Sequence, residues 1–224
     1  MVKFTTKLSL VVQIVIGIIS TRGTFFHVPP EHKILSQILV LETIVQYIEL
    51  AFYTYFFKQI DTISLSKMTC IRYYDWFFTT PAMLVSTVIY FRYEEHIENN
   101  QPGSLDFFEV LRQEQKSISL ICLSNFFMLL FGYLGETGKL DRKKSIPLGF
   151  AFFAITFKLV YRYAEKSTVG KKIFNILLPV WGLYGLAACF DEKFKNNMFN
   201  ILDIISKNFF SLYLYNLISK KVIP

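Results

Sequence analysis

A charged pair lies inside the last long apolar stretch of the chain, which runs from about residue 198 to residue 218. A helix through this stretch places Asp203 and Lys207 on one face, four residues apart. An ionised side chain near a bilayer centre costs several kcal/mol, so such residues usually face a bundle interior and carry function. Two interpretations remain open: a structural ion pair between helices, or a desolvated lysine that forms a Schiff base with Asp203 as part of its counterion.

A row of polar residues interrupts another apolar stretch, at residues 33–57. Glu42, Gln46 and Glu49 are spaced four and three residues apart, so they share one helical face. Two carboxylates and an amide are too costly to face lipid, so the row should face a polar interior or water. Interhelical hydrogen bonds of protonated glutamates would explain it, and so would the lining of an ion path.

A third polar constellation lies at residues 72–81. Arg72 and Asp75 stand three residues apart, and Pro81 frees a backbone carbonyl that needs another partner. With Asp203 and Lys207, the apolar stretches then contain two acids and two bases besides the glutamate row. This neutral set is what a protonated Schiff base, a two-carboxylate counterion and an arginine would need.

The elements that must position these residues are apolar stretches of membrane-span length, since a helical span needs about 20 mostly apolar residues. The sequence predicts seven of them, with short connections, and therefore an all-α membrane protein in lipid, with one seven-helix domain over residues 1–224. A polar connection at 92–116 should be a solvated loop. The spans cover residues 8–26, 33–57, 69–91, 117–135, 146–163, 172–190 and 198–218.

Composition argues against several other classes of protein. The chain is 53% hydrophobic and 17% aromatic, and its net charge of +7 is scattered among the connections, so no nucleic-acid groove is predicted. Cys70, Cys122 and Cys189 have no paired spacing, which predicts neither a disulfide framework nor a metal site. Lysine and arginine are shared almost equally between the two sets of connections, so charge does not set the orientation.

The motif Arg-x-x-Asp-Trp-x-x-Thr-Thr-Pro at 72–81, followed by Asp-x-x-x-Lys in the last span, resembles the microbial rhodopsins. Seven spans in this order extend the resemblance over essentially the whole chain. It implies a photoreceptor, not an enzyme, with all-trans retinal on Lys207, an extracellular amino terminus and a cytoplasmic carboxyl terminus. It also implies Asp75 as counterion and proton acceptor, Asp203 as second counterion and Arg72 as a gate.

The same resemblance implies a retinal pocket, whose far end would be remodelled because Gly185 and Ala188 stand where the family often has proline and tryptophan. On their own, Met128 and Gly132 would pass for ordinary packing residues. The implied pocket residues are Trp76, Thr79, Thr80, Met128, Gly132, Trp181 and Tyr184.

Family membership leaves the transported species open. Ser86 stands eleven residues after Asp75, where outward proton pumps often carry a carboxylate, and Glu192 is the single candidate for a proton-release group. Both observations weaken an efficient pump. The glutamate row is instead similar to the channelrhodopsins, and the finer pattern is closer to the channel-like giant-virus rhodopsins. Positions that match polar residues lining their cation path are Ser9, Glu42, Gln46, Glu49, Asn200, Asp203 and Asn208.

This closer resemblance implies a light-gated channel for monovalent cations that calcium can suppress, in a host cell membrane if the source is viral. It is also compatible with a homo-oligomer. The alternatives are an outward proton pump that uses Asp75 as acceptor, and a sensory photoreceptor that signals through a separate partner.

Overall fold

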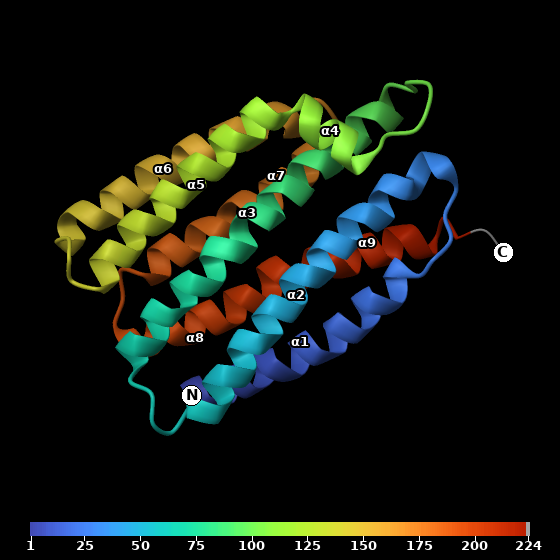
Figure 1. The fold of residues 1–224 in the computed structure, drawn as a ribbon. Coiled ribbons are helices and arrows are strands. Elements are labelled where there is room, and N and C mark those ends of the chain that lie inside the picture. Colours follow the sequence, from blue (N-terminus) through green and yellow to red (C-terminus); the bar gives the residue numbers. More distant parts are fainter. Residues whose placement is uncertain (223–224) are drawn as a thin grey trace.

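Helices running along one bundle make up nearly all of the computed structural model, which describes residues 1–222 (Figure 1). Residues 223 and 224 of the predicted domain lie outside the described residues. The long helices are α1 (Val2–Thr24), α2 (Lys33–Gln59), α3 (Leu65–Glu98), α5 (Gln115–Glu136), α6 (Arg142–Ala164) and α7 (Thr168–Ala187). The seventh segment combines α8 (Glu192–Asp203), a π-helical turn η2 (Ile204–Asn208) and α9 (Phe209–Ser219). The predicted all-α, seven-segment bundle is therefore confirmed.

Length and composition alone identify fewer than seven membrane spans. Among the described residues, four segments are long and apolar enough to cross a membrane: α1, Pro30–Gln59, α5 and α6. Helix α3 carries buried Arg72 and Asp75, α7 has a lysine pair within its first two turns, and the last segment is divided by η2. The segments that fall short are thus those in which polar groups or a break in the helix interrupt the apolar pattern.

Several helices begin at side chains suited to capping. Ser64, Asp106, Asp141, Ser167 and Asp191 each accept a hydrogen bond from a backbone amide in the following first turn. Such caps satisfy amide groups that have no partner within the helix. Helix α1 begins at residue 2, six residues before the predicted span, because its first turns bury a polar face against the bundle.

The predicted solvated loop at 92–116 is wrong in part. Helix α3 continues through Glu98, and a short helix α4 (Phe107–Gln113) follows. Phe107 and Val110 are buried, so α4 has an apolar face on the bundle. The Gln37 amide donates to Asp106 at 3.0 Å and accepts from the Phe107 amide at 3.1 Å, which ties the connection to α2.

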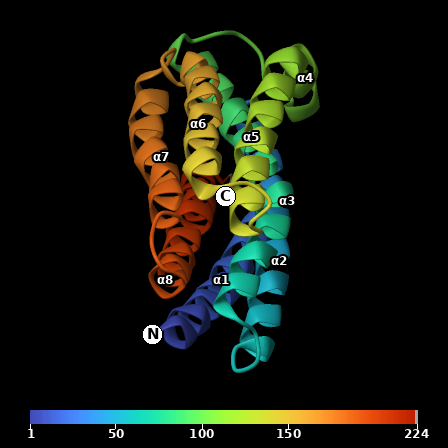
Figure 2. The same ribbon diagram turned by 90° about the vertical axis from the view of Figure 1, so that its left-hand side faces the viewer.

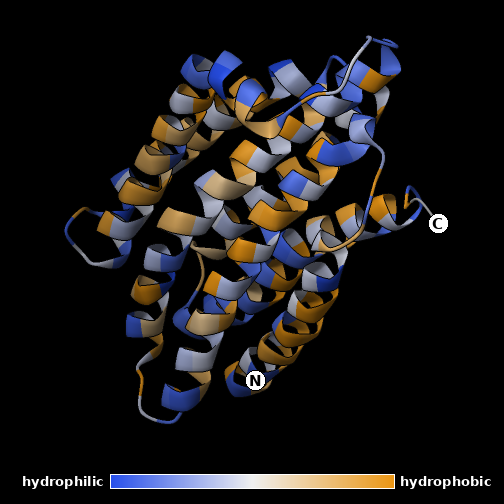
Figure 3. Cartoon of the chain, turned by 45° about the vertical axis from the view of Figure 1, so that its right-hand side comes forward, coloured by the Kyte–Doolittle hydropathy of each residue, from blue (hydrophilic) through white to orange (hydrophobic). Residues whose placement is uncertain are grey.

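Apolar side chains face outward along the middle of the bundle, whereas many polar ones face inward. Hydrophilic residues gather at the helix ends and turns in Figure 3. Phe4 is 67% exposed and Phe78 69%, while Gln13, Glu42 and Glu49 are fully buried. This arrangement suits a lipid environment, in which intramembrane polar groups face the bundle interior. Helices α5 and α6 pack as a pair, α1 packs on α2, and α8 approaches the amino-terminal half of α1 (Figure 2).

A histidine in the α1–α2 connection holds the end of the last helix. The Lys221 ammonium donates to His32 Nε2 at 3.1 Å, and the other ring nitrogen contacts the Tyr93 hydroxyl at 2.9 Å. Burial lowers the pKa of His32 from its ordinary value of 6.5, and the positive charge of Lys221 lowers it further. The folded state therefore favours the neutral ring, and this contribution is present above the ordinary pKa and lost as pH falls below it.

Hydrogen exchange of the backbone at residues 219–222, corrected for its intrinsic rate, should therefore accelerate as the pH falls below about 6.5. A His32→Gln variant keeps a polar side chain but does not titrate, so the pH dependence should disappear. An equally pH-dependent exchange in that variant would show that another group controls this end of the chain.

Candidate functional site

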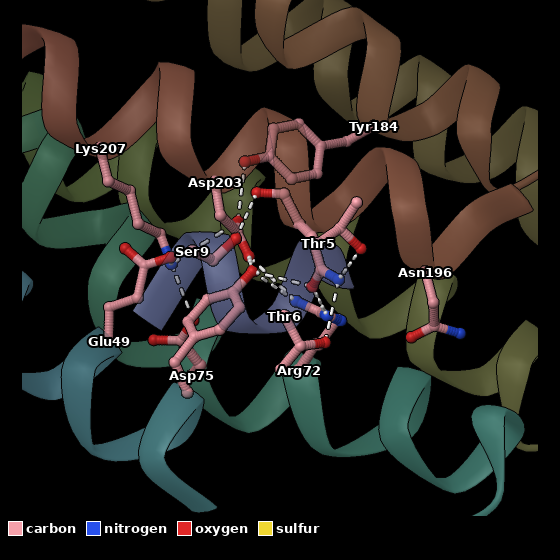
Figure 4. Close-up of polar contacts among 12 residues, drawn as sticks. Thr5, Thr6, Ser9, Glu49, Arg72, Asp75, Tyr184, Asn196, Asp203 and Lys207 are labelled. Atoms are coloured by element: carbon pink, nitrogen blue, oxygen red, sulfur yellow. Dashed lines mark hydrogen bonds and ion pairs between the residues drawn. The ribbon is translucent and has the colours of Figure 1, made fainter. Parts of the chain in front are cut away.

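Lys207 lies at the centre of the bundle, facing three carboxylates (Figure 4). Its Nζ donates to Asp75 Oδ2 at 2.7 Å and lies 3.4 Å from Glu49 Oε1 and 3.8 Å from Asp203 Oδ1. All four side chains are buried. The sequence predicted Asp75 and Asp203 here; the structure adds Glu49, which the sequence placed only in an ion path.

Arg72 provides the second positive charge of this network. Its Nη1 lies 3.0 Å from Asp203 Oδ2 and donates to the Tyr53 hydroxyl at 3.1 Å, while Nη2 donates to the Asn200 side-chain oxygen. Buried charges are tolerated only when they are paired and hydrogen-bonded. Two basic and three acidic side chains therefore share one network. The sequence predicted two acids and two bases around the Schiff base, and Glu49 is the additional acid.

Two tyrosines hold the Asp203 carboxylate from opposite sides. Tyr53 donates to Oδ2 and Tyr184 donates to Oδ1, each at 2.8 Å. Sequence analysis found Tyr184 but missed Tyr53. The signal was present, because Tyr53 follows Glu49 by four residues on the polar face of α2.

The π-helical turn η2 positions Lys207. A π-turn interrupts the regular helical hydrogen bonds and is frequent at functional sites. Two side chains donate to the Lys207 carbonyl oxygen: Gln46 Nε2 at 3.1 Å and Ser211 Oγ at 3.3 Å. Lys207 and its neighbour Asn208 are both buried in this turn. The apolar sequence here, without proline or glycine, gave no sign of this turn.

The polar network continues from Asn200 to the first turns of α1. The Asn200 amide donates to Thr5 Oγ1 at 2.8 Å and to Thr6 Oγ1 at 3.1 Å. Ser9 Oγ donates to the Asn200 carbonyl at 3.0 Å. The sequence had identified Ser9 and Asn200 but not the two threonines, which lie one turn before Ser9 on the same face.

On the other side of Lys207, Glu42 pairs with α3. The Ser86 hydroxyl donates to Glu42 Oε1 and also approaches the Met83 carbonyl at 2.9 Å. Gln46 lies between Glu42 and Glu49 on α2 and contacts the π-turn, whereas Asn208 is buried without a hydrogen-bond partner among the described residues. The predicted path residues thus lie along one buried seam between α1, α2 and the α8–η2 segment.

An apolar cavity adjoins Lys207 on the side away from this seam. It comprises about 840 Å³ of space not filled by protein atoms, part of it open to the surroundings. Trp76 and Trp181 both line it, as do Gly185 and Ala188 at the end expected to be remodelled. Other lining residues include Thr80, Met128, Leu129, Gly132, Phe150, Phe153 and Tyr184.

This lining fits an apolar polyene whose carbonyl end condenses with an amine, because Lys207 is the one amine among its aromatic and aliphatic side chains. A Cβ at Gly132 would lie 2.6 Å from the Tyr73 hydroxyl, so the glycine permits a close approach on this wall. Thr79 does not line the cavity described here; its hydroxyl donates to the Asp75 carbonyl at 3.0 Å.

A separate ion cluster around the fully buried Lys195, not foreseen from the sequence, lies near the start of α8. Lys195 Nζ contacts Glu136 Oε2 at 2.6 Å and Glu192 Oε1 at 2.7 Å. Thr69 donates to the other Glu192 oxygen at 3.0 Å. Glu192, the candidate proton-release group, is therefore engaged by a lysine and a threonine.

Comparison with known proteins gives the family. The sequence matches the family model described as "Bacteriorhodopsin-like protein" over residues 4–221. The fold is similar to viral rhodopsin OLPVRII, with a TM-score of 0.84 and 24% identity over 98% of each chain. It is also similar to xanthorhodopsin, described as a light-driven ion pump with dual chromophore, with a TM-score of 0.75 and 14% identity over 98% of this chain and 93% of that one. No curated protein matches the sequence significantly.

The family assignment fixes the cofactor and the surroundings. Family members are multi-pass membrane proteins that hold retinal covalently on a lysine of the final helix, and they act as pumps, channels or sensors, not as enzymes. Lys207, buried in the final segment beside the aromatic cavity, is that lysine. The chain belongs to the bacteriorhodopsin-like family of retinal-binding membrane proteins.

Proposed function

We propose that this protein is a light-gated channel for monovalent cations, with its path along the seam between α1, α2 and the α8–η2 segment. The observation that carries the proposal is the position of Glu49. This residue belongs to the polar row of α2 and also lies 3.4 Å from Lys207 Nζ. The polar row is therefore in direct contact with the lysine that holds retinal. Buried carboxylates along a path attract cations into it.

Retinal on Lys207 would supply light absorption and a light-driven change of geometry at the lysine nitrogen. Asp75 Oδ2, at 2.7 Å, is placed to accept the proton from that nitrogen. Once the nitrogen is uncharged, the attraction that holds Glu49 and Asp203 towards it is lost. Arg72 then remains as the neighbouring cation, and the polar groups of the seam are free to bind water and ions.

We further place the amino terminus outside the cell and the carboxyl terminus in the cytoplasm, as the resemblance implies. The threonines of α1 would then line the outer half of the path, and Glu42 with Ser86 its inner half. Two carboxylates in the path suit divalent cations, which would explain suppression by calcium. The similarity to a viral rhodopsin supports a host cell membrane as the site of action.

An outward proton pump is the second candidate, and one contact favours it. The Ser86 hydroxyl binds Glu42, so a carboxylate is present near the position where pumps often carry one. The pump is weakened because Glu192, the single release candidate, is already engaged in an ion pair with Lys195 at 2.7 Å. No contact of the described residues favours the sensor specifically.

The deciding experiment is the light-evoked current as a function of voltage, in cells given all-trans retinal, with external sodium and calcium varied. A current that reverses with the driving force and shrinks in calcium supports the channel. A current that stays outward at all voltages makes the protein a pump and the glutamate row a proton wire. Visible absorption without current would bring the sensor forward.

Replacing Glu49 by glutamine should weaken calcium suppression while leaving a visible absorption band. Glutamine keeps the volume but removes one anionic ligand, so the half-inhibiting calcium concentration should rise by about tenfold, equivalent to about 1.4 kcal/mol. The matched control is Glu165→Gln, which makes the same change at an exposed helix end. Unchanged conductance and calcium sensitivity in Glu49→Gln would rule out the α2 path.

A further inference from the structure

One residue on the polar face of α1 has no assigned role. Gln13 is fully buried, yet neither its amide nitrogen nor its amide oxygen has a hydrogen-bond partner among the described residues. Buried polar groups are nearly always satisfied, so an unpartnered amide inside a membrane bundle points to a ligand that the protein itself does not provide. Similar unpartnered oxygens occur on Gln46, Glu49 and Asn208.

The level of Gln13 in the bundle follows from contacts on either side of it. Ser9 Oγ contacts the Asn200 carbonyl, and a Cβ at Gly23 would lie 2.7 Å from the Tyr215 ring. Helix α1 and the last segment therefore run in the same direction, and the register between them changes by only about one residue over this length. Gln13 lies one turn beyond Ser9, which places it beside the start of η2, one turn beyond Asn200.

Helix α2 runs the opposite way and brings Glu49 to the same level. A Cβ at Gly23 would lie 2.7 Å from the Leu39 side chain. Further along, the Tyr53 hydroxyl lies 3.1 Å from the side-chain oxygen of Asn200, the residue whose carbonyl Ser9 contacts. Glu49 lies one turn from Tyr53 in the direction of Leu39. Gln13 and Glu49 are thus at the same level of two packed helices, next to the π-turn.

We propose that Gln13 and Glu49 are two oxygen ligands of a monovalent-cation site that the charged Lys207 nitrogen occludes in the dark. Carboxylate and amide oxygens are the ligands that such hard cations prefer. The side-chain oxygens of Gln46 and Asn208, which have no hydrogen-bond partner among the described residues, lie one turn further along and complete the set of oxygen ligands. The site deepens the proposed cation path and rests on it, since Gln13 lies on the α1 side of that path, one turn beyond Ser9.

Occlusion follows from charge. In the dark, Glu49 Oε1 lies 3.4 Å from Lys207 Nζ, and two cations at contact distance from one carboxylate repel strongly in a low-dielectric interior. When the Lys207 N–H bond breaks and an O–H bond forms on Asp75, the nitrogen loses its charge. Glu49 then no longer has a cation at contact distance, and a sodium ion can bind between it and Gln13. The ion must leave before the proton returns to the nitrogen.

The test is the rate at which the purified, retinal-loaded protein recovers its dark absorption after a flash. Recovery is measured in detergent in sodium chloride and in N-methylglucamine chloride of equal ionic strength. A bound ion retards recovery by the factor 1 + [Na⁺]/Kd, so sodium at twice its Kd should slow it about threefold. N-methylglucamine is too large to enter and should have no such effect.

Gln13→Leu should abolish the sodium dependence while leaving the dark absorption band in place. Gln13→Asn keeps the amide on a shorter side chain and should retain a weaker dependence, which guards against a folding defect in the leucine variant. Thr21→Val is the matched control on α1, because Thr21 contacts Tyr47 on an exposed part of the surface, outside the seam.

Recovery that is independent of sodium in the unmodified protein would overturn the site, and so would an unchanged sodium dependence in Gln13→Leu. These failures are distinct from failure of the channel. Passive cation currents with sodium-independent recovery would leave the channel standing without this site. Sodium-dependent recovery that requires Gln13, in a protein whose current is always outward, would leave the site standing without a conducting path.

Discussion

Replacing Lys207 by alanine should abolish visible absorption after incubation with all-trans retinal. Lys207 is the amine among the residues that line the aromatic cavity, so its loss removes the covalent attachment point and the charge that Asp75 and Glu49 surround. The measurement is the absorption spectrum of the purified protein. A denatured, borohydride-treated sample should likewise show no retinal on the chain.

The control for this prediction is Lys195→Ala. Lys195 is also fully buried and lies in the same terminal segment, but its ammonium pairs with Glu136 and Glu192, away from the cavity. This variant should lose stability and keep its visible band. A visible band of full intensity in Lys207→Ala would show that another residue carries the retinal.

Arg72→Ala should cause the largest loss of stability among single changes in the network. Arg72 pairs with Asp203 at 3.0 Å, and both side chains are almost completely inaccessible to solvent. Removing one partner of a buried ion pair leaves the other charge uncompensated, which costs about 3–5 kcal/mol. The measurement is the thermal bleaching midpoint of the retinal-loaded protein.

Arg142→Ala is the matched control, since Arg142 approaches Glu136 at 3.9 Å and is 43% exposed. Partly exposed ion pairs are worth about 0–1 kcal/mol, so the midpoint should change little. Arg72→Lys tests the geometry, because lysine keeps the charge but cannot reach Asp203, Tyr53 and Asn200 together. Equal midpoints for Arg72→Ala and Arg142→Ala would contradict a central role of the buried pair.

Much of the site was predictable because its residues follow the helical period. Asp203 and Lys207 are one turn apart, as are Arg72 and Asp75, and the structure brings both pairs together. The seven apolar stretches predicted the bundle, although length and composition alone identify only four of them among the described residues. The cofactor, retinal, was predicted from the resemblance to the microbial rhodopsins and not from the spacing of the residues.

Contacts between helices were not predictable in the same way. The approach of Glu49 to Lys207 depends on the position of α2 along the last segment. The residue spacing within a single helix carries no information about that position. The π-turn depends on Gln46 and Ser211 satisfying a carbonyl from two sides. The apolar face of α4 involves only Phe107 and Val110, too short a pattern to separate from a loop.

The Lys195 cluster has a mechanical consequence. Through Glu136, Glu192 and Thr69, the ammonium joins the ends of α5, α8 and α3. This corner is stiff, because moving any one of the three helices would uncover a buried charge. A deformation that starts at Lys207 should therefore displace α3, α5 and α8 least at this corner.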